Sequence, residues 1–192
     1  NKLSNYNLMA KELAMPVFFH NGGGELKADA VLEYAQPYLL DEIARMFPDL
    51  KILIGNMGVP FVEQTLAMVA KHKNVYADLT MRPSSVWQLY NTVVGAHERG
   101  VMDKLLFGSG FPVGNAQQCM ETLLGFNMLL ADTNLPGVPR SSIRAVIERD
   151  TLEVLGLTAD HSAVVGSKGD GAHEAGKQKK DRRDTKDKKS SE

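Results

Sequence analysis

The chain contains a single cysteine, Cys119, so its sequence excludes an internal disulfide framework and fits a reducing, cytoplasmic compartment. An excess of charge of one sign is also missing, because the formal net charge is −1. Such a chain has no global field that would attract nucleic acid or an anionic membrane. No apolar run approaches the roughly 20 residues of a membrane span. We therefore expect neither a nucleic-acid partner nor a membrane partner.

The composition is that of a folded domain followed by a polar extension. Hydrophobic residues make up 43% and charged residues 23% of the 192 positions, as in ordinary globular proteins. After about Leu157 large apolar side chains nearly disappear, and Lys, Arg, Asp, Gly and Ser dominate. Such a segment buries too little apolar surface to fold. The sequence predicts one domain over residues 1–157 and a disordered charged tail over residues 158–192.

Short apolar segments alternate with segments of helical periodicity along the whole domain. Each apolar segment ends in a polar or small residue: His20, Asn56, Asp78 and the pair Ser109-Gly110. The alternation predicts an α/β fold in which parallel strands are joined by right-handed helical crossovers. Because the carboxyl ends of parallel strands lie at one edge, we expect these residues to gather there.

Periodicity and turn residues also give the element boundaries. Pro37 is expected to kink or divide one long helix, and Ser141 or Ser142 to cap the last one. The predicted strands span residues 15–19, 52–54, 75–79 and 105–107, and the predicted helices span about 3–13, 29–47, 60–72, 83–100, 116–130 and 141–156.

Several motifs in series resemble those of the amidohydrolase-related family of metal-dependent (βα)8 barrels, which contains hydrolases and non-oxidative decarboxylases. The motifs are PDLKILIGNMG at residues 48–58, NVYAD at 74–78 and LFGSGFP at 106–112, and LAMPVFFHNG at 13–22 is similar to the family's strand that ends in a metal-ligating histidine. The likeness implies that these strands are strands five to eight, the C-terminal half of a TIM-type barrel. It also implies that the chain oligomerises or lacks an N-terminal half.

In that family a divalent metal such as zinc is held by two first-strand histidines, a fifth-strand histidine and an eighth-strand aspartate. The resemblance places His20 at the fifth-strand ligand, Asn56 at a sixth-strand histidine and Gly110 at the aspartate. Asparagine does not titrate near neutrality, and glycine offers no side-chain oxygen. Catalytic zinc normally has at least three protein ligands. We therefore expect no metal cofactor in this chain alone.

Other residues have alternative interpretations. His20 is either a vestigial ligand or a strand-end histidine bonded to a backbone carbonyl. Asp78 is a substitute ligand or, as we prefer, the cap of a neighbouring loop or helix. Arg82 either meets a substrate carboxylate or is solvated. Ser109 lacks the G-x-S-x-G setting of a nucleophile, and Cys119 lies in an apolar stripe typical of a core.

Two functions follow from these observations. The first is an amidohydrolase-like hydrolase or decarboxylase for a small carboxylate or lactone substrate, with His20 as metal ligand and Asn56, Asp78 and Gly110 lining the pocket. The second is a non-catalytic pseudoenzyme that keeps the scaffold for binding or assembly. Asn56 and Gly110 favour the second, and we predict no metal-dependent turnover by this chain alone.

Overall fold

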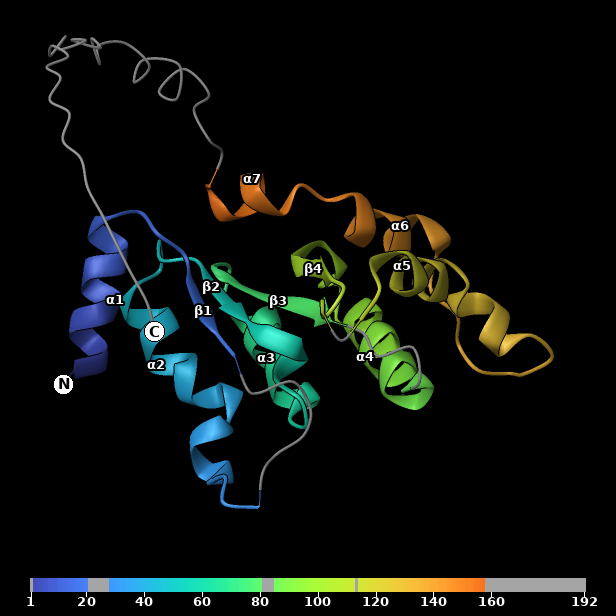
Figure 1. The fold of residues 1–192 in the computed structure, drawn as a ribbon, viewed down its shortest axis with the longest axis horizontal. Coiled ribbons are helices and arrows are strands. Elements are labelled where there is room, and N and C mark those ends of the chain that lie inside the picture. Colours follow the sequence, from blue (N-terminus) through green and yellow to red (C-terminus); the bar gives the residue numbers. More distant parts are fainter. Residues whose placement is uncertain (1, 21–27, 81–84, 113, 158–192) are drawn as a thin grey trace, which may run out of the picture. The chain divides into compact units, whose positions relative to one another are not determined.

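A computed structural model describes residues 2–20, 28–80, 85–112 and 114–157 (Figure 1). The predicted tail at 158–192 and Arg82 lie outside the described residues. Four strands form one parallel sheet in chain order, which confirms the predicted α/β fold of successive βα units. The strands are β1 (Val17–Phe19), β2 (Ile52–Ile54), β3 (Val75–Thr80) and β4 (Leu105–Gly108).

The helices of the first part of the chain follow the predicted order, and the division predicted at Pro37 is confirmed. The expected helix at 29–47 is three short pieces, because the proline ring of Pro37 supplies no N–H and holds Gln36 in an extended conformation (φ −75°, ψ 120°). The elements are α1 (Lys2–Glu12), η2 (Leu32–Ala35), η3 (Pro37–Leu40), α2 (Asp41–Met46), η4 (Gly55–Gly58), α3 (Val62–Lys71), α4 (Val86–Glu98) and η5 (Met102–Lys104).

The helices after β4 are also more divided than the periodicity predicts. The expected helix at 116–130 changes at Gly125 from α5 (Ala116–Leu124) to the 3-10 helix η6 (Phe126–Leu130). The last expected helix is α6 (Arg140–Glu148) followed by α7 (Thr151–Leu155). The predicted serine cap is wrong, since α6 begins at Arg140 without a side-chain cap. No helix in the described ranges is long and apolar enough to cross a membrane.

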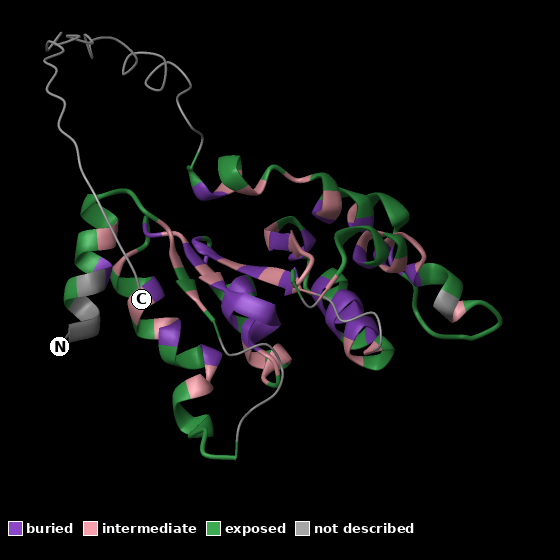
Figure 2. Ribbon diagram, viewed as in Figure 1, coloured by how far each residue is buried: buried purple, intermediate pink, exposed green. Residues whose placement is uncertain are grey.

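Buried and half-buried residues alternate along β3 (Figure 2), so the two faces of the sheet differ in how far they are covered. On β3, Val75, Ala77 and Leu79 are at most 3% exposed, whereas the alternate residues are half-buried. The buried face packs in one core with fully buried side chains of α3 and α4, among them Leu66 and Val93. Because side chains alternate across a strand, the other face of the sheet carries the half-buried set.

The side chains of Asn74 and Lys104 hold loops against this core through hydrogen bonds to backbone carbonyls. The Nδ2 of Asn74, which is 6% exposed, donates to the carbonyls of Ala44 (3.3 Å), Phe47 (2.9 Å) and Leu50 (2.9 Å). These three hydrogen bonds hold the turn that leads from α2 into β2. In the next βα unit, Nζ of Lys104 donates to the carbonyls of Val69 (2.8 Å) and His72 (2.7 Å) at the end of α3. Burial lowers the pKa of this ammonium group.

Candidate functional site

The candidate site is the edge of the sheet where the four strands end. The register pairs Phe19 with Ile54, Ile54 with Ala77, and Thr80 with Gly108. The residues that follow each strand therefore lie along one edge. His20, Asn56 and Gly110 leave β1, β2 and β4 there, and Asp78 lies near the same end of β3.

His20 rests against the end of the neighbouring strand. A Cβ atom on Gly55 would stand 2.9 Å from Nδ1 of His20, so the imidazole fits there because position 55 has no side chain. The ring centroids of His20 and Phe18 are 5.7 Å apart. The imidazole is exposed and makes no hydrogen bond to another described residue. Steric contact with β2 therefore positions the imidazole, and its solvent-exposed edge is accessible to a ligand.

The segment after β2 is a turn of left-handed backbone. Asn56 (φ 50°, ψ 37°) and Met57 (φ 51°, ψ 24°) precede Gly58 at φ 62°, and all three are buried. A left-handed conformation costs a residue with a side chain roughly 1–2 kcal/mol, although asparagine tolerates it better than methionine. The turn must therefore be held by contacts elsewhere in the fold.

Asp78 supplies one of those contacts. Its Oδ1 accepts hydrogen bonds from the backbone N–H of Asn56 (2.9 Å), the backbone N–H of Thr80 (3.1 Å) and the Thr80 hydroxyl. With three donors from the protein, this oxygen is committed to joining the β2 loop to the end of β3. These contacts agree with the loop-capping interpretation of Asp78. Thr80 belongs to no sequence motif, so its part in this contact was not predicted.

We expect Asp78→Ala to lower the free energy of unfolding by about 2 kcal/mol, because two partly buried N–H groups lose their acceptor while the turn stays left-handed. Asp78→Asn keeps an acceptor oxygen and should cost clearly less. Urea unfolding of both variants measures the difference. Equal stability of Asp78→Ala and the parent chain would show that the carboxylate does not hold the turn.

Gly110 leaves the loop after β4 without the carboxylate that an aspartate would supply at this position. Gly110 has φ +66°, and a Cβ atom there would lie 3.1 Å from Cγ2 of Thr80. The Ser109 hydroxyl accepts a long bond from the N–H of Phe111 (3.4 Å), and the Ser109 carbonyl accepts one from the thiol of Cys119 (3.6 Å). Burial raises the pKa of this thiol, so it stays protonated at neutral pH, as a core cysteine does.

The residues at this edge do not fit a metal ion. Within the described ranges no group of three or more His, Cys, Asp or Glu side chains is placed to hold one. At the four strand ends, His20 supplies the imidazole and Asp78 the carboxylate, but Oδ1 of Asp78 already accepts three hydrogen bonds. A catalytic zinc site normally needs three protein ligands. The prediction that this chain uses no metal cofactor stays a prediction.

The strand ends also enclose little space within the described residues. A cavity of about 20 Å³ lies beside the left-handed turn, which is room for about one water molecule rather than a substrate. Its walls come from η4, the end of β3 and the start of α4: Asn56, Met57, Val59, Leu79, Thr80, Ser85, Gln88, Leu89 and Thr92.

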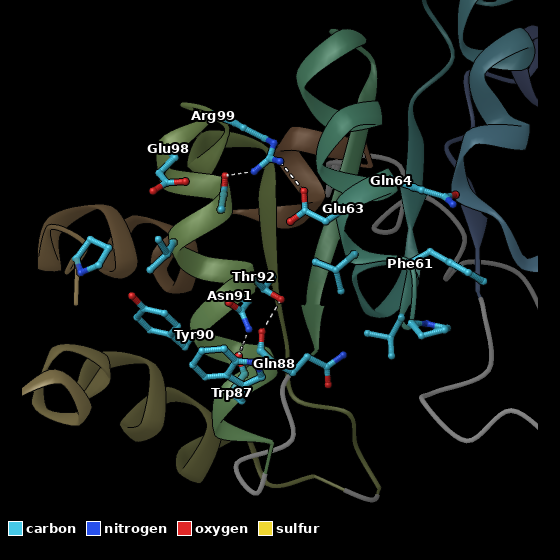
Figure 3. A pocket seen from close by; sticks show the side chains of 16 residues that line it. Phe61, Glu63, Gln64, Trp87, Gln88, Tyr90, Asn91, Thr92, Glu98 and Arg99 are labelled. Atoms are coloured by element: carbon cyan, nitrogen blue, oxygen red, sulfur yellow. Dashed lines mark hydrogen bonds and ion pairs between the residues drawn. The ribbon is translucent and has the colours of Figure 1, made fainter. Parts of the chain in front are cut away.

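A much larger cleft, of about 980 Å³, lies in the helix layer between α3 and α4 (Figure 3). An ion pair between Glu63 and Arg99 (2.5 Å) joins the two helices across it. Toward the start of α4, the 69% exposed indole of Trp87 stacks on Tyr90 with ring centroids 5.7 Å apart. Gln88 lines both this cleft and the small cavity. No motif in the sequence indicates this cleft, because it arises from the packing of two helices.

Comparison with known proteins agrees with this arrangement of strands. Residues 8–131 match the amidohydrolase family Amidohydro_2, and the chain belongs to that family, whose members are metal-dependent. Its fold is similar to that of an uncharacterized TIM-barrel protein from Bordetella bronchiseptica, with a TM-score of 0.60 and 19% identity over 81% of this chain. The match covers 50% of that protein, so this chain spans about half of its length. A search of curated protein sequences finds no match.

Proposed function

We propose that this chain forms strands five to eight of an amidohydrolase barrel and has no metal-dependent activity by itself. The order of its motifs and the position of His20 at the end of β1 support the assignment to the C-terminal half. The family chemistry would be metal-assisted hydrolysis or decarboxylation of a small carboxylate or lactone compound. The observation that carries the proposal is the donor set at the strand ends, in which Gly110 offers no oxygen and Asp78 is bonded within the protein.

The chain also lacks the side chain that would transfer a proton at this site in the family, just as it lacks a metal ligand at Gly110. In the family the sixth-strand histidine acts beside the metal as an acid or base or orients the substrate, and this chain has Asn56 in its place. An amide side chain donates and accepts hydrogen bonds but does not titrate near pH 7. The left-handed backbone also fixes the position of Asn56 through its N–H bond to Asp78. The residue can therefore orient a bound molecule without acting as acid or base.

A scaffold for assembly is the second candidate function, and one observation favours it. The face of the sheet opposite the helices is incompletely covered, with Phe18 54% exposed on β1. Parallel sheets are normally buried on both faces. A chain that leaves such a face open can serve as one component of a larger barrel.

Metal content tests the proposed function directly. After dialysis against Zn²⁺ or Mn²⁺ and removal of loosely bound ions, elemental analysis of the full chain should give far less than one metal per chain. The same preparation should show no metal-dependent hydrolysis of small lactones and no decarboxylation of small aromatic carboxylates. His20→Ala is the control variant. Stoichiometric metal that His20→Ala abolishes would contradict the proposal.

A further inference from the structure

The cleft between α3 and α4 has the size of a ligand-binding site. Its volume of about 980 Å³ lies at the upper end of the range of roughly 300–1,000 Å³ that is common for small-molecule pockets. Its walls come from α3, the segment just before α3, α4, and Pro136 in the segment between η6 and α6. All lining residues lie between positions 59 and 136, so the cleft needs no wall from outside the described part of the chain.

Three stacked aromatic rings support one end of this cleft, near the start of α4 (Figure 3). The rings of Trp87 and Tyr90 are 5.7 Å apart at 26°, and those of Tyr90 and Phe126 are 5.9 Å apart at 8°. Phe126 is fully buried and Tyr90 is 9% exposed, whereas Trp87 is 69% exposed. The two inner rings therefore hold the indole in place and leave it accessible. Aromatic faces of this kind stack on flat rings and attract cations.

The charged side chains of the cleft leave one carboxylate without a partner. The guanidinium of Arg99 pairs with Glu63 (2.5 Å) and also donates to the carbonyl of Gly95 (3.1 Å). Glu98 also lines the cleft, is exposed and forms no ion pair with another described residue. Two carboxylates against one guanidinium give the lining a formal excess of one negative charge. Charge complementarity therefore favours a cation over an anion, because the one positive group is already paired.

The free carboxylate and the aromatic rings lie on the same side of α4 (Figure 3). Tyr90, Val94 and Glu98 are four residues apart, so they form one row along the helix, and all three line the cleft. Glu98 is about 12 Å beyond Tyr90 along the helix axis. Because side chains lean toward the N-terminus of their helix, the carboxylate leans back toward the rings. A ligand of modest length can therefore reach both.

We propose that this cleft binds an organic cation made of a flat apolar ring and an ammonium group on a short flexible arm. The ring stacks on Trp87, and the ammonium group pairs with Glu98. The site lies in the helix layer and uses none of His20, Asn56, Asp78 and Gly110 at the strand ends. It is therefore independent of the proposed function.

Isothermal titration calorimetry of the full chain at low ionic strength tests this proposal with three ligands of the same ring and arm. Phenylbutylamine carries the cation, phenylbutanol is its neutral counterpart, and phenylbutanoate is the anion. The amine should bind at least about fivefold more tightly than the alcohol, as expected for a cation at an exposed aromatic and carboxylate site. The carboxylate should bind more weakly than either. Added NaCl should narrow the difference between amine and alcohol, because salt screens exposed ion pairs.

Two substitutions separate the two contacts. Glu98→Gln removes the charge at nearly constant shape and should abolish the preference for the amine. Trp87→Leu removes the stacking surface and should weaken the amine and the alcohol alike by about fivefold or more. The control is Glu121→Gln, which makes the same change of charge at an exposed position on α5 and should keep the preference. All three positions are exposed, and far-UV circular dichroism confirms that the variants are folded.

Three outcomes would overturn the proposal. The first is an amine that binds no better than the alcohol, which would leave the cleft without selectivity for a cation. The second is a preference that persists in Glu98→Gln, which would place the cation elsewhere on the molecule. The third is the absence of measurable heat of binding for the amine at millimolar concentration.

Discussion

Replacing Asn74 by leucine is expected to lower the free energy of unfolding by about 3 kcal/mol. The amide of Asn74 donates to the carbonyls of Ala44, Phe47 and Leu50, and it is 6% exposed. Leucine has nearly the same shape but donates no hydrogen bond, so the carbonyls of Ala44 and Leu50 would lose this donor, while that of Phe47 keeps its bond from the N–H of Leu50. The turn into β2 should loosen, and with it the strand on which Asn56 depends.

Asn91 provides the matched control for this experiment. Its amide also donates to a backbone carbonyl, that of Trp87 (2.9 Å), but the residue is exposed on α4. Asn91→Leu should change stability by no more than about 0.5 kcal/mol, because water replaces the lost bond. Urea titrations of both variants give the two values, provided the slope of the unfolding curve is unchanged. A loss at Asn74 no larger than that at Asn91 would mean that its hydrogen bonds do not hold the turn.

Gly58→Ala is expected to lower the free energy of unfolding by about 3 kcal/mol, from left-handed strain and overpacking together. Gly58 has φ +62°, and a Cβ atom there would overlap the Thr65 hydroxyl and stand 2.7 Å from Cγ of Pro37. Both neighbours belong to packed elements, η3 and α3, that flank the left-handed turn. The turn after β2 would have to shift, and Asn56 would move with it.

Gly100→Ala separates the two contributions. Gly100 has nearly the same backbone angle, φ +65°, but an added Cβ would meet nothing within 4 Å. Its replacement should therefore cost only the conformational part, about 1 kcal/mol. Thermal or urea unfolding of the two variants gives the steric part as the difference. Equal losses would show that the pocket around Gly58 yields easily and does not fix the turn.

The strands were predictable because each is a short apolar run, and β2 and β3 are buried on the side that faces the helices. β1 begins at Val17, two residues later than predicted. β2 has the predicted bounds, and β3 and β4 extend one residue past theirs. The helix breaks were harder, because apolar periodicity continues across them. One signal was present: Asp150 followed by Glu153 is typical of a helix start, and Asp150 does cap α7 through the N–H groups of Leu152 and Glu153 (both 3.0 Å).

The sequence yields candidate positions for the site but not their contacts. The resemblance to the family supplied the positions of His20, Asn56 and Gly110. That the Asp78 carboxylate binds the backbone of Asn56 depends on the register of β2 against β3, which no local pattern encodes. The same holds for Thr80, whose role comes from its closeness to Gly110 across the sheet.

The position of Trp87 has a practical consequence for spectroscopy. It is the chain's one tryptophan, and its indole is 69% exposed against the ring of Tyr90 on the helix layer. Its fluorescence should therefore respond to molecules that enter the cleft between α3 and α4. Because the open face of the sheet lies opposite the helix layer, a polypeptide that binds there should leave the emission spectrum unchanged. One optical signal can thus distinguish occupancy of the outer layer from closure of the barrel.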